Sequence, residues 1–554
     1  MTTRVHISFI LSIPQVRDAV AQWLDLRYLK HCQLVSRDWQ ETFTPVVWRR
    51  RSIVVGARKE PFESDLSQFF LSAFGRHFRR LRVCRILSLA AIQPYCQHIS
   101  HIDVEFDMDG DGTVNGEGRW QELTQFIESS CHQLQSLAFR KKSLFRPDGL
   151  LTALRQTFPA SQSLRSLTFD CPADVSLSTK FVLDLLINLP QLETLELQLG
   201  RVWKVDHDEA LLKRSTFRLR TMDLGNMGHF RLRNPHVVFP FWRQCPFLQT
   251  MDGYPILEKE DFQQFVSIFD CSNTGGQPGR SVRCLSLPFV LDAFSLADGQ
   301  LAHILRGCTR NHLTTLLMGA CPLGPEAFEV LLNTQSMSLQ YVQMSGRVVQ
   351  GTNSSPWIQR LLASCPRLEI LAVKYSEAEI TFGVHLHVDD ILTGPWVCSN
   401  LSSFYVPIVG VPPTGPLVQG RCGVDRATVI DRVMRQIGKM TKLKQFGSTT
   451  IAKVRLDTGA LSAGSTQAFV APDTLPFSLG PGSGGGLQHL AKLTELEELG
   501  LRRHALEIGI DEAKWMTEHW KAFRKVRGLH RPWDAGAMDA VAWIKSKKVE
   551  VTDS

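Results

Sequence analysis

A six-residue pattern of leucines and polar residues recurs along most of this chain. Its clearest copy is Leu192-Glu193-Thr194-Leu195-Glu196-Leu197, with leucine at the first, fourth and sixth positions. Successive side chains of a strand point to opposite faces of a sheet. The pattern therefore predicts a short strand in which Leu195 and Leu197 face a core, while Thr194 and Glu196 face away from it.

The pattern has fourteen candidate copies, and most successive copies begin 26 to 35 residues apart. They start at Phe78, Ile99, Leu134, Leu164, Leu192, Leu219, Leu248, Val282, Leu313, Leu339, Leu368, Leu401, Leu443 and Leu496. Both the pattern and its spacing resemble the leucine-rich repeat, in which strands alternate with helices.

Apolar residues between the copies recur at helical spacing, as at Phe181, Leu185, Leu186 and Leu189. A proline cannot continue a helix, and prolines stand just before three of the strand patterns, at Pro190, Pro246 and Pro366. Each unit is thus predicted to be a helix, a proline stop and a strand. Since one unit cannot bury its own apolar face, the units must stack. We predict an irregular α/β solenoid over residues 76–505, with parallel strands on the concave side and helices on the convex side.

Residues 12–50 carry a different pattern, which predicts two short amphipathic helices. The first would begin at Ser12-Ile13-Pro14, with serine as a cap and proline in the first turn. Asp25-Leu26-Arg27 would separate it from a second helix, which runs from Leu29 to Phe43 and ends at Pro45. Two such helices could simply close the open end of the solenoid.

The same segment resembles an F-box. The resemblance is carried by Ile13, Pro14, Leu24, Leu29 and Cys32, by the run Leu34-Val35-Ser36-Arg37-Asp38-Trp39, and by Pro45 and Trp48-Arg49. In that family the F-box docks on a Skp-family adaptor and so joins a cullin-based ubiquitin ligase. The residues expected to contact the adaptor are Ile13, Pro14, Val16, Leu24, Leu29, Leu34, Val35 and Trp39. F-box followed by leucine-rich repeats is a familiar domain order among ligase substrate receptors, including divergent fungal ones.

The remaining segments are expected to be simpler. Residues 1–11 form a tail and residues 51–75 a linker. Residues 457–486 are rich in Gly, Ser, Thr and Pro and are expected to form a flexible loop. After Leu501 the leucine pattern stops, so residues 506–554 are expected to form a helical cap over the last repeat.

Composition limits the functional classes. The 554 residues are 44% hydrophobic and 21% charged, as in ordinary folded proteins, and the net charge of +8 does not require nucleic acid. The 13 cysteines lack paired spacing, which favours free thiols in a reducing compartment. Neither a signal peptide nor an apolar run long enough for a membrane span is seen, so we expect the cytoplasm or nucleus.

Four groups of residues have side chains that could bind a metal or take part in a reaction. Asp107, Asp109 and Asp111 with Gly112 resemble half of an EF-hand loop, but Gly118 stands where the bidentate Glu belongs. Two other groups, His385, His387 and Asp389, and Cys96, His98 and His101, carry metal-ligand residue types without a second shell. The cysteines that each precede a repeat leucine by three residues are expected to be packing residues: Cys131, Cys245 and Cys365. We expect no metal, no cofactor and no enzymatic activity.

Arginines gather at the first repeat, at Arg76, Arg79, Arg80, Arg82 and Arg85. A solvated strand face explains them without a ligand, and an acidic partner is the alternative. Nucleic-acid binding would need interleaved aromatic residues or a reading helix.

The outward positions of the pattern are the place to look for a binding surface. Glu196, Asp223 and Asp252 occupy the fifth position of three successive copies, and Asp170 the seventh position of the copy before them. Strands about 4.8 Å apart would align these carboxylates in one acidic stripe that contacts a basic segment of a substrate. Tyr341 and Tyr405 would add apolar contacts further along.

These expectations combine into a substrate-recognition adaptor of an SCF-type (Skp, cullin, F-box) ubiquitin ligase, with an unknown protein as substrate. A repeat scaffold without ubiquitin transfer is the first alternative, and a metal-dependent enzyme is the second.

Overall fold

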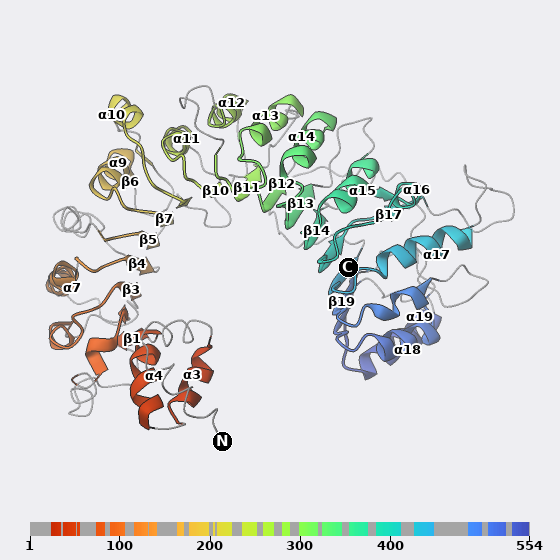
Figure 1. Cartoon of the computed structure of the whole chain (residues 1–554), viewed down its shortest axis with the longest axis horizontal. Coiled ribbons are helices and arrows are strands. Elements are labelled where there is room, and N and C mark those ends of the chain that lie inside the picture. Colours follow the sequence, from red (N-terminus) through yellow and green to blue (C-terminus); the bar gives the residue numbers. More distant parts are fainter. Residues whose placement is uncertain are drawn as a thin grey trace, which may run out of the picture. The chain divides into compact units, whose positions relative to one another are not determined.

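The chain folds into two compact units, residues 1–248 and 249–554, which we describe one at a time (Figure 1). The computed structural model describes residues 24–34, 37–50, 52–55, 72, 74–83, 89–105, 116–130, 132–140, 163–170, 177–198, 203–204, 208–223, 235–251, 259–270, 280–287, 298–318, 324–345, 354–374, 384–410, 426–447, 486–500, 508–527 and 535–552. The expected tail and most of the first expected helix lie outside these residues.

The first unit begins with two helices, α3 (Leu26–Cys32) and α4 (Arg37–Arg50). They pack through a small core of Leu29, Phe43, Val46 and Val47. The single helix predicted from Leu29 to Phe43 is therefore wrong, because a turn at residues 33–34 separates the two helices. The expected stop at Pro45 is also wrong. Proline lacks a backbone donor, but α4 continues past it and buries Val46 and Val47.

Seven parallel strands follow in this unit, each hydrogen-bonded to the next. They are β1 (Ser52–Val55), β2 (Arg80–Val83), β3 (His101–Glu105), β4 (Ser136–Arg140), β5 (Ser166–Asp170), β7 (Thr194–Gln198) and β9 (Thr221–Asp223). The connecting helices are η1 (Gly75–His77), α6 (Leu89–Ile92), α7 (Gly116–Ser130), α9 (Thr179–Asn188), α10 (Glu209–Arg214) and α11 (Pro235–Arg243). Two short strands, β6 (Leu177–Ser178) and β8 (Trp203–Lys204), pair separately. The sheet thus starts inside the segment 51–75 that was expected to be a linker.

The second unit repeats the arrangement with ten parallel strands. They are β10 (Thr250–Met251), β11 (Cys284–Leu287), β12 (Thr315–Met318), β13 (Tyr341–Ser345), β14 (Ile370–Lys374), β16 (Ser403–Tyr405), β18 (Gln445–Gly447), β19 (Glu498–Gly500), β20 (Lys525–Arg527) and β21 (Glu550–Thr552). The helices are α12 (Lys259–Ser267), α13 (Asp298–Arg306), α14 (Pro325–Gln335), α15 (Ser355–Ser364), α16 (Val388–Ile391), α17 (Arg426–Ile437), η5 (Leu487–Lys492), α18 (Ile510–His519) and α19 (Ala535–Ser546). A separate pair is formed by β15 (Leu386–His387) and β17 (Ile408–Val409).

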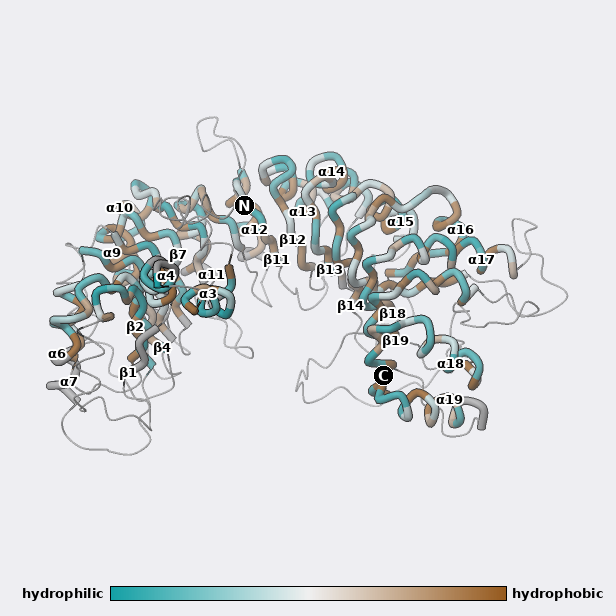
Figure 2. Tube along the Cα trace, turned by 60° about the horizontal axis from the view of Figure 1, so that its bottom comes forward, coloured by the Kyte–Doolittle hydropathy of each residue, from teal (hydrophilic) through white to brown (hydrophobic). Residues whose placement is uncertain are grey.

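The leucine pattern predicts the strands correctly. All fourteen of its first residues are at most 2% exposed, and every corresponding strand begins two residues later. Hydrophobic and hydrophilic positions alternate closely along these elements (Figure 2). In each unit, helices cover one side of the strands (Figure 1). The chain therefore has the α/β solenoid fold of leucine-rich-repeat type that the sequence predicts.

In both units, backbone hydrogen bonds join successive repeats at the turn before a strand. The amides of Glu193 and Thr194 both donate to the carbonyl of Arg165, at 2.8 and 2.9 Å, and the amides of Gln445 and Lys444 donate in the same way to Ser402. Each turn thus satisfies its backbone groups on the preceding repeat. The predicted proline stops are also confirmed, since α9, α11 and α15 end at Asn188, Arg243 and Ser364, each two or three residues before its proline.

The expected cap at residues 506–554 consists instead of two more repeats, α18 with β20 and α19 with β21. Their strands escape the leucine pattern because Phe523 and Val526 occupy two of the leucine positions of the first, and both are buried. The expected loop 457–486 lies outside the described residues except for Gly486. Among the helices described, none combines the length and apolar character needed to cross a membrane.

Candidate protein-interaction site

The helices α3 and α4 present one apolar side chain of the F-box-like segment to solvent. Leu34, in the turn between them, is 83% exposed, and Tyr28 on α3 is also exposed. Leu29, by contrast, is 0% exposed and lies in the core beside Phe43. The expectation that Leu29 contacts an adaptor directly is therefore wrong, because its side chain is already fully buried.

The other expected adaptor contacts are less completely described. Leu24 is partly buried against the α3–α4 core, and Trp39 lies on α4, with its side chain outside the described part. Ile13, Pro14, Val16 and Val35 lie outside the described residues altogether.

The end of α4 is fixed to the first repeat by aromatic contacts. The ring centroid of Trp48 lies 5.3 Å from that of Phe74 and 5.5 Å from that of Phe78. Phe78 is the first residue of the first leucine pattern, and it is buried. The two N-terminal helices are thus anchored on the sheet of the first unit through large apolar side chains, each of which contributes well to packing.

In strand β7 the outward positions face away from the core, as predicted. In β7, Leu195 and Leu197 are fully buried, whereas Thr194 and Glu196 are only partly buried. The hydroxyl of Thr168 on β5 donates to Glu196 Oε2 at 3.2 Å, and these two residues are direct neighbours in the strand register.

Only part of the predicted acidic stripe lies in the described residues. Asp223 is the register partner of Glu196, which places both on the same row, and Asp170 lies on β5. The side chains of Asp170 and Asp223 are outside the described part of the structure, and so is the whole of Asp252. Among the four carboxylates of the stripe, Glu196 has a side chain in the described part of the structure.

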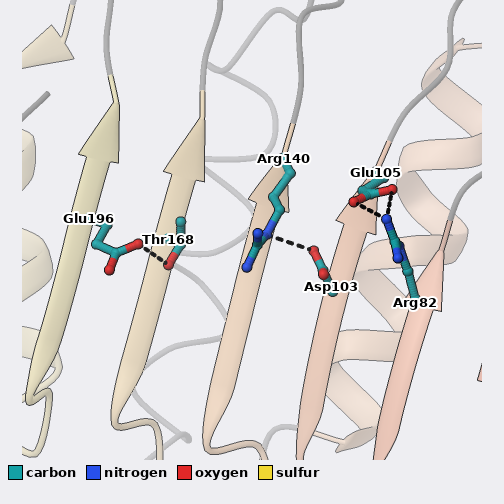
Figure 3. Close-up of polar contacts among 6 residues, drawn as sticks. All are labelled: Arg82, Asp103, Glu105, Arg140, Thr168 and Glu196. Atoms are coloured by element: carbon teal, nitrogen blue, oxygen red, sulfur yellow. Dashed lines mark hydrogen bonds and ion pairs between the residues drawn. The ribbon is translucent and has the colours of Figure 1, made fainter. Parts of the chain in front are cut away.

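Further along the same face, arginines neutralise the carboxylates (Figure 3). Arg82 donates to both carboxylate oxygens of Glu105 at 2.5 Å, and Arg140 Nε lies 3.3 Å from Asp103 Oδ1. Burial raises the pKa of Asp103, and the charge of Glu105 raises it further against the lowering effect of Arg140 and Arg82. Asp103, which occupies the same pattern position as Glu196, therefore adds no free negative charge to that stripe.

Tyr405 does not contribute an exposed contact, and its predicted role is wrong. Its side chain is only 4% exposed, and its hydroxyl donates to Glu498 Oε1 at 3.2 Å. Arg527 Nε lies 2.5 Å from the same oxygen. Burial, followed by the charge of Glu498, raises the pKa of Tyr405 strongly. The tyrosine is a buried member of a polar group on β16, β19 and β20.

Glycines explain how Tyr405 becomes buried at an outward position. The residue paired with Tyr405 on β18 is Gly447, and the next partner, on β19, is Gly500. Without side chains at these positions, the tyrosine ring can lie across β18 and reach Glu498. The two glycines, at the same pattern position of consecutive repeats, are the sequence signal that would have predicted this arrangement.

Removing the Tyr405 hydroxyl tests this arrangement. We expect Tyr405→Phe to lower the free energy of unfolding by about 1 kcal/mol, the usual size of one hydrogen bond. Tyr405→Ala is expected to cost about 3–5 kcal/mol, since it also leaves a cavity. Urea denaturation followed by circular dichroism measures both. If Tyr405→Ala unfolds at the wild-type urea concentration, the side chain is not part of the packed structure.

The third and fifth positions of the pattern carry no charge on five neighbouring strands of the second unit, β11, β12, β13, β14 and β16, whereas the seventh position of β14 is Lys374. These positions are Cys284, Ser286, Thr315, Leu317, Tyr341, Gln343, Ile370, Ala372, Ser403 and Tyr405. Within them, Leu317, Tyr341 and Ile370 remain partly exposed, and we call these three residues the apolar stripe. Tyr341 pairs with Ile370 in the register, and its hydroxyl lies 3.3 Å from Gln343 Oε1. Uncharged, aromatic and aliphatic surface of this kind is typical of the centre of protein–protein interfaces.

The other candidate groups have structural explanations. His387 caps α16 by accepting from the Asp389 amide at 3.3 Å, and no cluster of potential metal ligands occurs among the described residues. Cys96 is buried, which raises the pKa of its thiol to about 12, and His98 and His101 instead contact Gln133 and Ser100. The half EF-hand at Asp107–Gly112 lies outside the described part of the chain.

The recurring cysteines are confirmed as packing residues where they are described. Cys245 and Cys365 are fully buried, and burial raises the pKa of the Cys365 thiol to about 12. Cys131 lies outside the described residues.

Comparisons with known proteins give remote structural similarity. No protein-family model and no curated protein matches the sequence. A solved yeast complex of Rad7 and Elc1 is 14% identical over 68% of this chain and 91% of that chain, with a TM-score of 0.35. A TLR13 complex with the RNA ssRNA13 is 13% identical over 87% of this chain and 65% of that chain, with a TM-score of 0.34. Similarity this low carries no argument about function, and the repeat fold is established by the strand pairing itself.

Proposed function

We propose that this chain is the substrate-recognition adaptor of an SCF-type E3 ubiquitin ligase. In this role the F-box-like helices dock on a Skp-family adaptor, which links them to a cullin, and the repeats bind a protein substrate. The chain itself makes and breaks no bond. It raises the effective concentration of a substrate lysine near the ubiquitin-charged enzyme of the complex. Such an assembly would operate in the cytoplasm or nucleus.

The observation that carries the proposal is the position of Leu34. It lies in the most specific part of the F-box-like motif, and 83% of it is exposed although it follows a helix whose Leu29 is fully buried. An exposed leucine beside a well-packed small core gives a partner an apolar contact without requiring the helices to unfold. Exposed Tyr28 on α3 adds to this surface, since aromatic residues are enriched at protein interfaces.

Support for a substrate-binding role comes from the apolar stripe of the second unit. Five strands without charge at the third and fifth pattern positions favour a substrate segment that brings apolar side chains, rather than the basic segment expected from the acidic stripe. Five strands about 4.8 Å apart span about 20 Å, the length of a six-residue extended segment. Gln343 and Thr315 can hydrogen-bond the backbone of such a segment at its edges.

Co-purification of the full chain tests the proposal. Tagged wild-type chain is expected to retain a Skp-family adaptor and a cullin, together with a substrate that accumulates when the proteasome is inhibited. Ile370→Lys is expected to lose the substrate and keep the adaptor, since it places a charge in the apolar stripe. Thr168→Lys, a matched lysine on an outward position of the first unit, is expected to keep both.

Two results would contradict the proposal. A chain that retains the adaptor without any cullin would favour the scaffold without ubiquitin transfer. A chain that retains neither would leave α3 and α4 as a cap of the solenoid.

A further inference from the structure

A cluster of arginines forms where α4 meets the first repeat. Trp48 of α4 packs on Phe78, with ring centroids 5.5 Å apart. Arg49 follows Trp48 in the chain, and Arg79 follows Phe78. The aromatic contact therefore brings together basic residues from two segments that are distant in sequence. Arg76 and His77 of η1 complete the group, and we call Arg49, Arg76, His77 and Arg79 the junction cluster.

The members of the junction cluster repel one another. Burial lowers the pKa of Arg79, and the nearby charge of Arg49 lowers it further. Burial also lowers the pKa of His77, with added repulsion from Arg76, Arg49 and Arg79. Like charges held close together cost free energy unless an anion offsets them. The fold therefore holds several positive groups close together at this surface, and a bound anion would offset their repulsion.

Nothing in the described part of the chain supplies that anion. No carboxylate there lies within 4.0 Å of the side chains of Arg49, Arg76 or Arg79, whereas Arg82 on the adjacent strand is paired with Glu105. Arg79 Nη1 donates to the carbonyls of Arg76 and Phe78, both at 3.2 Å, which holds its guanidinium in place. Arg76 Nε donates to His77 Nε2 at 3.3 Å. Each guanidinium has five N–H donors, so most other donors of this cluster have no hydrogen-bond acceptor among the described residues.

The geometry points to a compact anion with more than one negative charge. Guanidinium groups match phosphate oxygens with paired, charge-assisted hydrogen bonds. We propose that the junction cluster binds a phosphorylated side chain of a partner protein, with Arg49, Arg76 and Arg79 as its donors. His77 Nε2 accepts from Arg76 Nε, which orients one guanidinium of the cluster.

A nucleic acid fits the same surface less well, for two reasons. The aromatic rings at the cluster, Trp48 and Phe78, are packed against each other and offer no free face for stacking bases. A phosphate backbone that continued along the outward face of the sheet would next meet Asp103 and Glu105 on β3. The positive residues thus extend to Arg80 and Arg82 of β2 and give way to acidic residues on the next strand, so they form no long track.

Binding of two immobilised peptide libraries to the full chain tests the proposal. Both libraries have degenerate flanks, and one carries phosphoserine at the central position where the other carries serine. Wild type is expected to prefer the phosphorylated library by about tenfold or more, the size of one charge-assisted hydrogen bond. Arg49→Gln with Arg76→Gln is expected to remove this preference. Arg79 is left unchanged because it holds two backbone carbonyls.

The matched control is Arg310→Gln with Arg367→Gln, which removes the same charge from exposed arginines of the second unit. It is expected to keep the wild-type preference. Equal retention of the two libraries by wild type, including no retention of either, would overturn the proposal, and so would loss of preference in the control. Cluster-dependent binding of a 20-residue oligothymidylate that is tighter than phosphopeptide binding would assign the site to nucleic acid instead. Adaptor capture by the cluster variant separates this result from a failure of the proposed ligase function.

Discussion

Leu34→Asp is expected to abolish capture of the Skp-family adaptor while leaving the free energy of unfolding nearly unchanged. The leucine is 83% exposed and lies in a turn, where aspartate is well tolerated. In a complex it would place an unpaired charge in an apolar contact, which costs about 3 kcal/mol or more and weakens binding by at least about 100-fold. Pull-down of the adaptor by the full chain, with circular dichroism of each variant, gives the measurement.

The matched control is Leu29→Ala on the neighbouring helix. Leu29 is fully buried beside Phe43, so its loss is expected to lower the free energy of unfolding by about 2–5 kcal/mol. The pair separates a contact residue from a core residue within the same motif. If the Leu34→Asp chain captures the adaptor as well as wild type does, the exposed turn is not the docking surface.

Trp520→Ala is expected to lower the free energy of unfolding by about 4 kcal/mol. The side chain is 1% exposed, and its ring lies 5.6 Å from that of Trp515 and 5.3 Å from that of Phe523. Its Nε1 donates to the carbonyl of Leu490 at 3.0 Å, which joins η5 of one repeat to α18 of the next. Because repeats are stabilised mainly by their neighbours, the loss should loosen both.

Trp520→Phe is the control for the hydrogen bond. It keeps most of the apolar burial but leaves the Leu490 carbonyl without its donor, which costs about 1–3 kcal/mol. Urea denaturation gives the total change, and hydrogen exchange locates it, since long repeat arrays need not unfold in one step. Wild-type exchange rates at β19 and β20 in the Trp520→Ala chain would mean that the two repeats are not coupled through this residue.

The sequence predicts the structure best at pattern positions that are buried in every repeat. The first residue of the pattern, a leucine in eleven of the fourteen copies, is buried in every copy, so the pattern and its spacing located fourteen strands. The pattern does not detect β20, because Phe523 and Val526 stand in place of leucine and are also buried. The pattern cannot predict contacts between residues that are far apart in the sequence. Tyr405 is buried because glycines stand at Gly447 and Gly500, and its acceptor Glu498 lies 93 residues further along the chain.

The F-box-like segment shows the same limit at short range. A motif identifies Leu29 and Leu34 as important but does not say which of them faces a partner. That distinction depends on how α3 and α4 pack together, and the turn between them is set by tertiary contacts rather than by the helical spacing of the apolar residues. The sequence groups the arginines of the first repeat. It does not show that Arg49 lies near them, because that depends on the contact of Trp48 with Phe78 in the folded chain.

The backbone hydrogen bonds between repeats have a consequence for the evolution of this chain. The amides of a turn bond to the turn of the preceding repeat, and these bonds set no limit on the number of residues between the two turns. Leu443 and Leu496 begin patterns 53 residues apart, yet β18 and β19 pair residue by residue, just as closely spaced strands do. Insertions between strand and helix can therefore accumulate without disturbing the register. New surface loops, and with them new partners, can be acquired while the scaffold stays the same.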